Sequence, residues 1–145
     1  MDLVVDANIF IAALIKNSVT SDLLVEDTIR LYTPEFLLEE FEKYKEEILE
    51  KTHRSPENYK NFLEILMRRI EFIPREELDP FLAEAENISP DPKDTIYFAI
   101  ALRIGARIWS NDKRFHDQKR VRIISTTELW HFFRMIRDIP DESSP

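Results

Sequence analysis

A chain of 145 residues with 43% hydrophobic and 33% charged content has the size and composition of one folded domain. Its apolar runs are shorter than the ~20 residues that a membrane helix needs, and its N-terminus lacks the basic region of a signal peptide. We therefore expect a soluble, cytoplasmic protein with no membrane partner. The absence of cysteine excludes thiolate metal sites, and the single glycine excludes a glycine-rich phosphate loop.

The net charge of −8 argues against a nucleic-acid partner, but the charges are unevenly distributed. The segment from Lys93 to Arg122 contains eight basic residues and only three acidic ones. Such a basic segment within an acidic protein is compatible with phosphate binding beside a metal site. A merely solvated surface explains it equally well.

The hydrophobic pattern predicts strands that alternate with helices. Strands are expected at 2–5, 31–33, 70–73, 106–110 and 121–125, and helices at 7–15, 18–30, 34–51, 59–69, 76–87, 95–103 and 126–137. This alternation predicts an α/β fold, a three-layer α/β/α sandwich with a central parallel β-sheet. Residues 1–138 are expected to form a single domain, followed by a flexible C-terminal tail at 139–145.

Asp6 follows the first predicted strand directly, at the edge where an open α/β sheet gathers its functional groups. The alternative is that Asp6 only caps the next helix. Asn8 interrupts an otherwise apolar segment, and we expect it to be a buried amide that orients Asp6 or a metal-bound water.

Asp91 and Asp94 surround Pro92 at the start of a strongly apolar helix. Helix capping alone would explain both acids. Asp94 also precedes a helix that leads into the strand 106–110, so its side chain is expected at the same sheet edge as Asp6.

Asp112 comes two residues after the strand 106–110, which repeats the position of Asp6, and Ser110 is placed to orient these carboxylates. Glu40 shares a helix face with the apolar residues Phe36 and Phe41, whereas Glu39 and Glu46 lie away from that face. A carboxylate on an apolar face needs a partner, and a divalent cation held by several carboxylates would provide one.

Four segments together resemble the PIN-domain nucleases: VVDANIFIAAL, TPEFLLEEFEKY, DPKDTIYFAIALRIGARIWSNDKRF and VRIIS. The resemblance implies a PIN-like fold. It also implies that Asp6, Glu40, Asp94 and Asp112 are the catalytic, metal-binding acids for Mg²⁺ or Mn²⁺. By the same resemblance Asp91 is an additional acid, and Asn8 and Ser110 are supporting residues.

The implied activity is metal-dependent endonucleolytic hydrolysis of RNA, leaving a 5′-phosphate and a 3′-hydroxyl. Basic residues that follow Asp112 are candidates for contacts with the RNA backbone: Lys113, Arg114, Lys119 and Arg120. Many small PIN proteins are toxins of toxin–antitoxin pairs, so an antitoxin partner is expected, and the apolar segments 7–15 and 18–30 favour a homodimer. The alternatives are a housekeeping RNA-processing nuclease and a non-catalytic module that binds RNA or protein.

Overall fold

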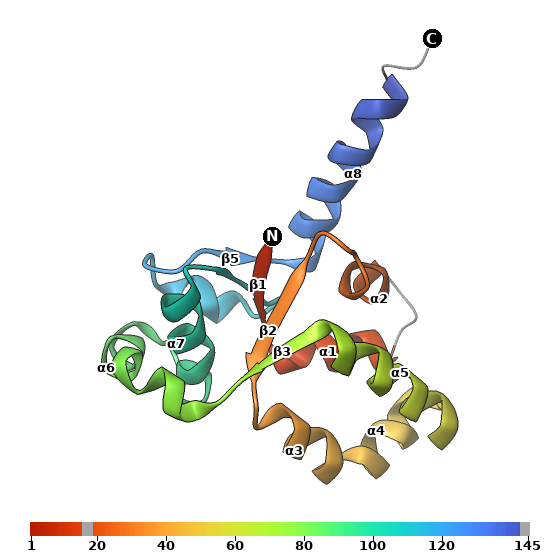
Figure 1. The fold of residues 1–145 in the computed structure, drawn as a ribbon, viewed down its shortest axis with the longest axis horizontal. Helices are drawn as coiled ribbons and strands as arrows, with labels where there is room; N and C mark the ends of the chain where they lie inside the picture. The colour runs from red at the N-terminus through yellow and green to blue at the C-terminus, as the bar shows by residue number, and fades with distance from the viewer. Residues whose placement is uncertain (16–18, 143–145) are drawn as a thin grey trace.

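The computed structural model describes residues 1–15 and 19–142, in which five parallel strands form one sheet in the order β3-β2-β1-β4-β5 (Figure 1). The strands are β1 (Asp2–Val5), β2 (Arg30–Pro34), β3 (Ile70–Ile73), β4 (Arg107–Trp109) and β5 (Ile123–Ile124). The chain builds β1, β2 and β3 in one direction and then returns to place β4 on the other side of β1. This reversal puts the topological switch point of the sheet between β1 and β4.

Helices cover both faces of the sheet. They are α1 (Ala7–Ile15), α2 (Val19–Leu24), α3 (Leu37–Lys43), α4 (Lys45–Thr52), α5 (Pro56–Arg69), α6 (Asp79–Ile88), α7 (Thr95–Ile104) and α8 (Thr126–Glu142), with short 3₁₀ helices η1 (Arg75–Leu78), η2 (Pro92–Asp94) and η3 (Lys113–Asp117). The predicted α/β/α sandwich with a central parallel sheet is confirmed.

Alternate residues of β1 divide the core between the two faces. Leu3 and Val5 pack with apolar side chains of α1–α5 and α8, whereas Val4 packs with those of α6 and α7. Figure 1 shows α6 and α7 on one side of the sheet and α1, α2 and α5 on the other. Because Leu3, Val4 and Val5 are fully buried, β1 fixes the position of Asp6, which follows it directly.

The helix predicted at 18–30 is wrong in its extent. Ser18 lies outside the described residues, and the helix observed from Val19 ends at Leu24. The Arg69 side chain donates to the Leu24 carbonyl at 3.0 Å and to the Glu26 carbonyl at 2.7 Å. Arg69 thus satisfies carbonyls that a continuing helix would have used.

The helix predicted at 34–51 is also wrong, because it is two helices. Pro34 is the last residue of β2, and α3 gives way to α4 at Tyr44, whose ψ of 13° departs from the helical value. The Tyr59 hydroxyl donates to the Phe41 carbonyl at 3.3 Å. In an unbroken helix that carbonyl would accept from the backbone N–H of Lys45.

The ends of α7 and α8 complete the description of the fold. Gly105 has φ of 68°, in the left-handed region that favours glycine, and ends α7. The final helix continues to Glu142, beyond its predicted end, so it overlaps the predicted flexible tail, of which 143–145 lie outside the described residues. No helix in the described parts of the chain is long and apolar enough to cross a membrane.

Candidate active site

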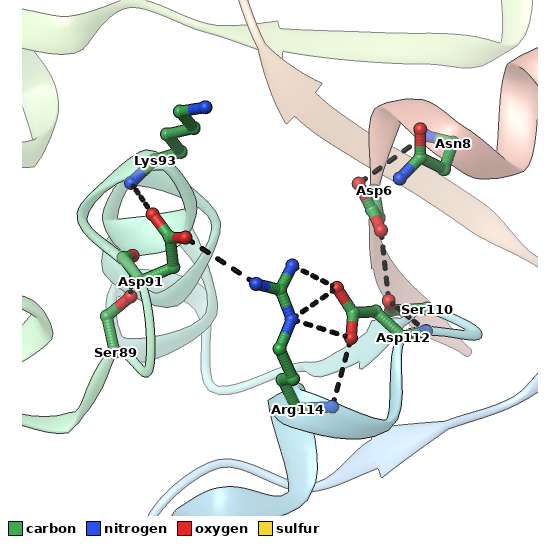
Figure 2. Close-up of polar contacts among 8 residues, drawn as sticks. All are labelled: Asp6, Asn8, Ser89, Asp91, Lys93, Ser110, Asp112 and Arg114. Carbon is green, nitrogen blue, oxygen red and sulfur yellow. Dashed lines mark hydrogen bonds and ion pairs between the residues drawn. The ribbon is translucent and has the colours of Figure 1, made fainter.

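Asp6 lies at the switch point of the sheet, one residue past β1. Its backbone N–H donates to the Trp109 carbonyl at 3.1 Å, which extends the pairing of β1 with β4 and sets Asp6 beside Ser110. The Ser110 hydroxyl donates to Asp6 Oδ2 at 2.9 Å (Figure 2). Burial, with only 5% of Asp6 exposed, raises the pKa of its carboxyl, and the charge of Asp112 raises it further, against the lowering effect of the Ser110 hydrogen bond.

Asn8 does not have the environment that the sequence predicted. Its side chain is exposed, and the group that meets Asp6 is its backbone N–H, which lies 3.4 Å from Asp6 Oδ1. The prediction of a buried amide is therefore wrong. Asn8 begins the exposed side of α1, and the buried side is provided by Ile9 and Phe10.

Asp91 and Asp94 have different roles at the start of α7. The Asp91 carboxylate accepts from the Lys93 N–H at 2.9 Å and so caps η2. The Asp94 carboxylate makes no capping hydrogen bond with α7. Burial and the charges of Asp6 and Asp91 raise the pKa of Asp94 to about 6. Helix capping therefore accounts for Asp91 but not for Asp94.

Glu40 faces the same cavity as Asp6 and Asp94. This cavity of about 400 Å³, called here the catalytic cavity, is lined by residues of α1, α3, α4 and α7. Its lining consists of Asp6, Ala7, Asn8, Ile11, Phe36, Leu37, Glu40, Phe41, Tyr44, Glu47, Ile48, Lys93, Asp94 and Tyr97. Three of the four predicted acids thus border one half-apolar hollow at the carboxyl edge of the sheet.

Asp112 is the fourth predicted acid, and it is bound to Arg114 instead of lining the catalytic cavity. Arg114 Nη2 lies 2.8 Å from Asp112 Oδ2, and Nε lies 3.2 Å from Oδ1, so one guanidinium holds both carboxylate oxygens (Figure 2). These hydrogen bonds lower the pKa of Asp112. Arg114 Nη1 also lies 3.6 Å from Asp91 Oδ2. The Asp112 N–H donates to Ser110 Oγ at 3.1 Å, which joins Asp112 to Asp6 through one hydroxyl.

Of the four residues predicted to contact RNA, the two arginines form ion pairs with acids and the two lysines are exposed. Arg114 is engaged as just described, and Arg120 Nε pairs with Glu84 at 3.0 Å. Lys113 and Lys119 are exposed. Lys113 lies in η3 beside the acids, whereas Lys119 borders a separate hollow formed around β5.

Tyr97 is a site residue that sequence analysis missed. Its hydroxyl accepts a hydrogen bond from the Ala7 N–H at 3.3 Å, and its ring lines the catalytic cavity. Burial, together with the charges of Asp6, Asp94 and Glu40, raises its pKa. Tyr97 stands three residues after Asp94, and this i, i+3 spacing on one helix face was the available signal.

Asn111 was also missed. Its side-chain amide exchanges two hydrogen bonds with Thr126, accepting from the backbone N–H at 2.8 Å and donating to the hydroxyl at 3.0 Å. This pairing ties the segment that carries Asp112 to the start of α8. Because the partners are 15 residues apart, no local sequence pattern indicates the contact.

The donor atoms around Asp6 suit a hard divalent cation. They are carboxylate oxygens, which Mg²⁺ and Mn²⁺ prefer. Burial and the charges of neighbouring acids raise the pKa values of Asp6 and Asp94, so a bound cation would offset the cost of ionising them. Within the described residues, however, no three acid or histidine side chains are close enough to hold an ion as they stand. The ligand atoms therefore suit a divalent cation, but the carboxylates would have to move closer together to bind one ion.

Asp94→Asn is expected to raise the melting temperature of the metal-free protein near pH 7 and to change it little near pH 4. The folded-state pKa of Asp94, about 6, lies above the value of ~3.9 in an unfolded chain, so folding disfavours the charged carboxylate. For such an acid the loss of stability develops as pH rises from about 4 to about 6. Thermal unfolding in EDTA at both pH values measures the effect.

Asp2→Asn, at the opposite end of β1 and outside the catalytic cavity, is the control. Mn²⁺ should raise the melting temperature of the wild type but not of Asp94→Asn, because an ion that binds only the assembled acids stabilises the folded state. A metal-induced shift that persists in Asp94→Asn would exclude Asp94 as a ligand.

The fold and the site define a class: α/β/α proteins with a parallel sheet and an acidic cluster at its switch point. The family model described as PIN domain matches residues 4–128, so the chain belongs to the PIN-domain family, and the resemblance seen in the sequence is confirmed. A chain in the crystal structure of VapBC2 from Rickettsia felis, bound to a DNA fragment from its promoter, is similar in fold. That match has a TM-score of 0.62 and 16% identity, and covers 86% of this chain and 98% of the other. No curated protein matches this sequence.

Proposed function

We propose that this PIN-domain protein is a cytoplasmic endoribonuclease that hydrolyses RNA phosphodiester bonds with Mg²⁺ or Mn²⁺. The observation that carries the proposal is the position of Asp6, which is buried at the switch point and shares the catalytic cavity with Glu40 and Asp94. A buried carboxylate beside two others is costly unless a cation joins them. Membership of the PIN-domain family supports the same reading.

The residues of the site have separate tasks in this proposal. Asp6, Glu40 and Asp94 hold the ion, and Ser110 fixes the Asp6 carboxylate through its 2.9 Å hydrogen bond. A bound divalent ion would lower the pKa of the attacking water and neutralise charge on the phosphate and the leaving oxygen. Asp112 joins the ligands when Arg114 releases it.

Basic side chains then contact the substrate. Arg114, once released from Asp112, is within the site and binds a phosphate oxygen, for which a guanidinium is well suited. Lys113 is exposed in the same 3₁₀ helix and contributes a second, weaker contact. Lys119 and Arg120 follow on the same surface segment, and we assign them to more distant backbone phosphates.

The test is cleavage of a labelled single-stranded RNA by the purified protein with Mn²⁺ or with EDTA. We expect cleavage with Mn²⁺ and none with EDTA, and we expect single-stranded DNA of the same sequence to survive. Cleavage that persists in EDTA would contradict the metal-dependent mechanism. Absence of cleavage across varied RNAs would contradict the enzyme.

A non-catalytic module that binds RNA or protein is the second candidate. One observation favours it: Asp112 is held by Arg114, and within the described chain no three ligands are in reach of one ion. Titration of Mn²⁺ into the protein without RNA separates the two, because only the nuclease requires a carboxylate site that binds the ion.

We also propose that the protein is the toxin of a toxin–antitoxin pair. The structural neighbour named VapBC2 supports an antitoxin partner, although the low identity limits the likeness to the fold. A small antitoxin reading frame beside this one would support the toxin role. A gene with no such neighbour would favour a housekeeping nuclease that processes RNA.

A homodimer remains a proposal, but its predicted basis changes. Most apolar side chains of α1 and α2 are in the core, so these segments do not offer the expected free face. Exposed apolar side chains occur instead on α8, at Phe132, Met135 and Ile136. Light scattering of the purified chain measures the mass, and a monomer at all concentrations would contradict the dimer.

A further inference from the structure

A second hollow opens directly beside the catalytic cavity. This hollow, called here the flanking cavity, has a volume of about 470 Å³, within the range of ~300–1,000 Å³ that small-molecule sites occupy. Its lining includes Phe36, Arg75, Glu86 and Lys93. Phe36 and Lys93 line both cavities, so the two hollows are adjacent.

The flanking cavity lies at the same edge of the sheet as the acids. Phe36 follows β2 by two residues, and Arg75 follows β3 by two residues. Because the strands are parallel, their carboxyl ends share one edge with Asp6 and Ser110. The two cavities thus lie side by side at the carboxyl ends of β1, β2 and β3.

Phe36 provides an aromatic surface between the two cavities. Phe36 is 37% exposed. It meets Tyr97 edge-to-face, with ring centroids 6.4 Å apart and an interplanar angle of 69°. Contact with Tyr97 holds the ring in place while one part stays open to a ligand, and an unpaired nucleobase stacks on such a ring.

The charges of the flanking cavity favour an anion. Arg75 and Lys93 are exposed, and neither side chain forms an ion pair within the part of the chain that the structure describes. By contrast, Arg103, Arg114 and Arg120 each pair with an acid. Glu86 is the single acid of the lining and is exposed. Two unpaired cations beside an acidic site are therefore available for phosphate.

We propose that the flanking cavity binds the nucleotide next to the scissile phosphate of a single-stranded RNA, with the base on Phe36 and the backbone phosphate on Arg75 and Lys93. The assignment rests on the proposed ribonuclease function, since it places the scissile phosphate in the catalytic cavity. An unpaired base is required, because a base within a duplex cannot stack on a protein ring.

Binding of a fluorescein-labelled single-stranded RNA, measured by anisotropy in EDTA at low salt, tests this subsite without any cleavage. Phe36→Ala should raise Kd at least about fivefold, the loss expected for one stacked base. Arg75→Gln should raise Kd and lower the slope of log Kd against log salt by ~0.7, the value for one phosphate contact on a single strand. Arg68→Gln is the matched control, because Arg68 is exposed just before the opposite end of β3.

The outcomes separate the subsite from the enzyme. Unchanged Kd and salt slope in Arg75→Gln and Phe36→Ala would overturn the subsite even if the wild type cleaves RNA, as would an absence of RNA binding by the wild type. Arg75 is an exposed side chain, so its variant keeps the test valid if Phe36→Ala is unstable. RNA that binds through Phe36 and Arg75 but is never cleaved would support the subsite and contradict the ribonuclease.

Discussion

Asp6→Asn is expected to reduce Mn²⁺-dependent RNA cleavage by more than about 100-fold. Residues that only support a metal ligand cost 10–100-fold when removed, and Asp6 is proposed as a ligand itself. The amide keeps the size of the carboxylate, and its oxygen can still accept the hydrogen bond from the Ser110 hydroxyl. It lacks the negative charge that binds the ion. Initial rates on labelled RNA at saturating Mn²⁺ measure the loss.

Unfolding is not expected to explain that loss. Burial raises the pKa of Asp6, so the folded protein disfavours the charged carboxylate, and this penalty is present above the unfolded-state pKa of ~3.9. Near pH 7 the metal-free Asp6→Asn variant should therefore melt no lower than the wild type. Asp2→Asn, at the other end of the same strand, is the control and should keep full activity. Substantial cleavage by Asp6→Asn would remove Asp6 from the metal site.

Sequence patterns predicted the sheet well because its strands are short, apolar and clearly bounded. Val4 and Val5 are fully buried, as the apolar run of β1 implies, and Pro74 marks the end of β3 at Ile73. Strand alternation with helices then determines a parallel sheet, and with it the shared edge on which Asp6 and Ser110 meet. That much follows from local composition and general rules of topology.

The errors come from contacts between distant residues. The interruption at Tyr44 accompanies a hydrogen bond from Tyr59 to Phe41, and the early end of α2 depends on Arg69, 45 residues from Leu24. A hydrophobic period carries no information about either partner. These are cases in which tertiary contacts override local propensity.

The site shows the same division. The acids were chosen as candidates because they follow strands or share a helix face with apolar residues, and Glu40 does line the catalytic cavity. The state of Asp112 was not predictable, because Arg114 follows it by two residues and basic side chains near an acid usually remain solvated. Only the structure shows that this guanidinium donates hydrogen bonds to both carboxylate oxygens of Asp112 and forms an ion pair with Asp91.

Arg114→Gln is expected to change metal binding and catalysis in opposite directions. Without the guanidinium, Asp112 is free to ligate, and its carboxyl stays ionised at neutral pH even after its lowered pKa returns toward ~3.9. Because the Arg114 side chain is exposed and ion pairs at the surface are weak, Mn²⁺ affinity should rise by only up to about fivefold. Calorimetric titration of Mn²⁺ without RNA measures this gain.

Cleavage at saturating Mn²⁺ should nevertheless fall by about 10–100-fold in Arg114→Gln, since the variant loses the charged hydrogen bond that the guanidinium would donate to phosphate. Arg114→Lys should retain part of the rate, because an ammonium keeps the positive charge but cannot hydrogen-bond two phosphate oxygens in the bidentate geometry of a guanidinium. Arg107→Gln, at the amino end of β4, is the control and should change neither quantity. A variant that binds Mn²⁺ more tightly and also cleaves faster would mean that Arg114 only obstructs the site. Weaker Mn²⁺ binding would mean that Arg114 organises the acids instead of competing for Asp112.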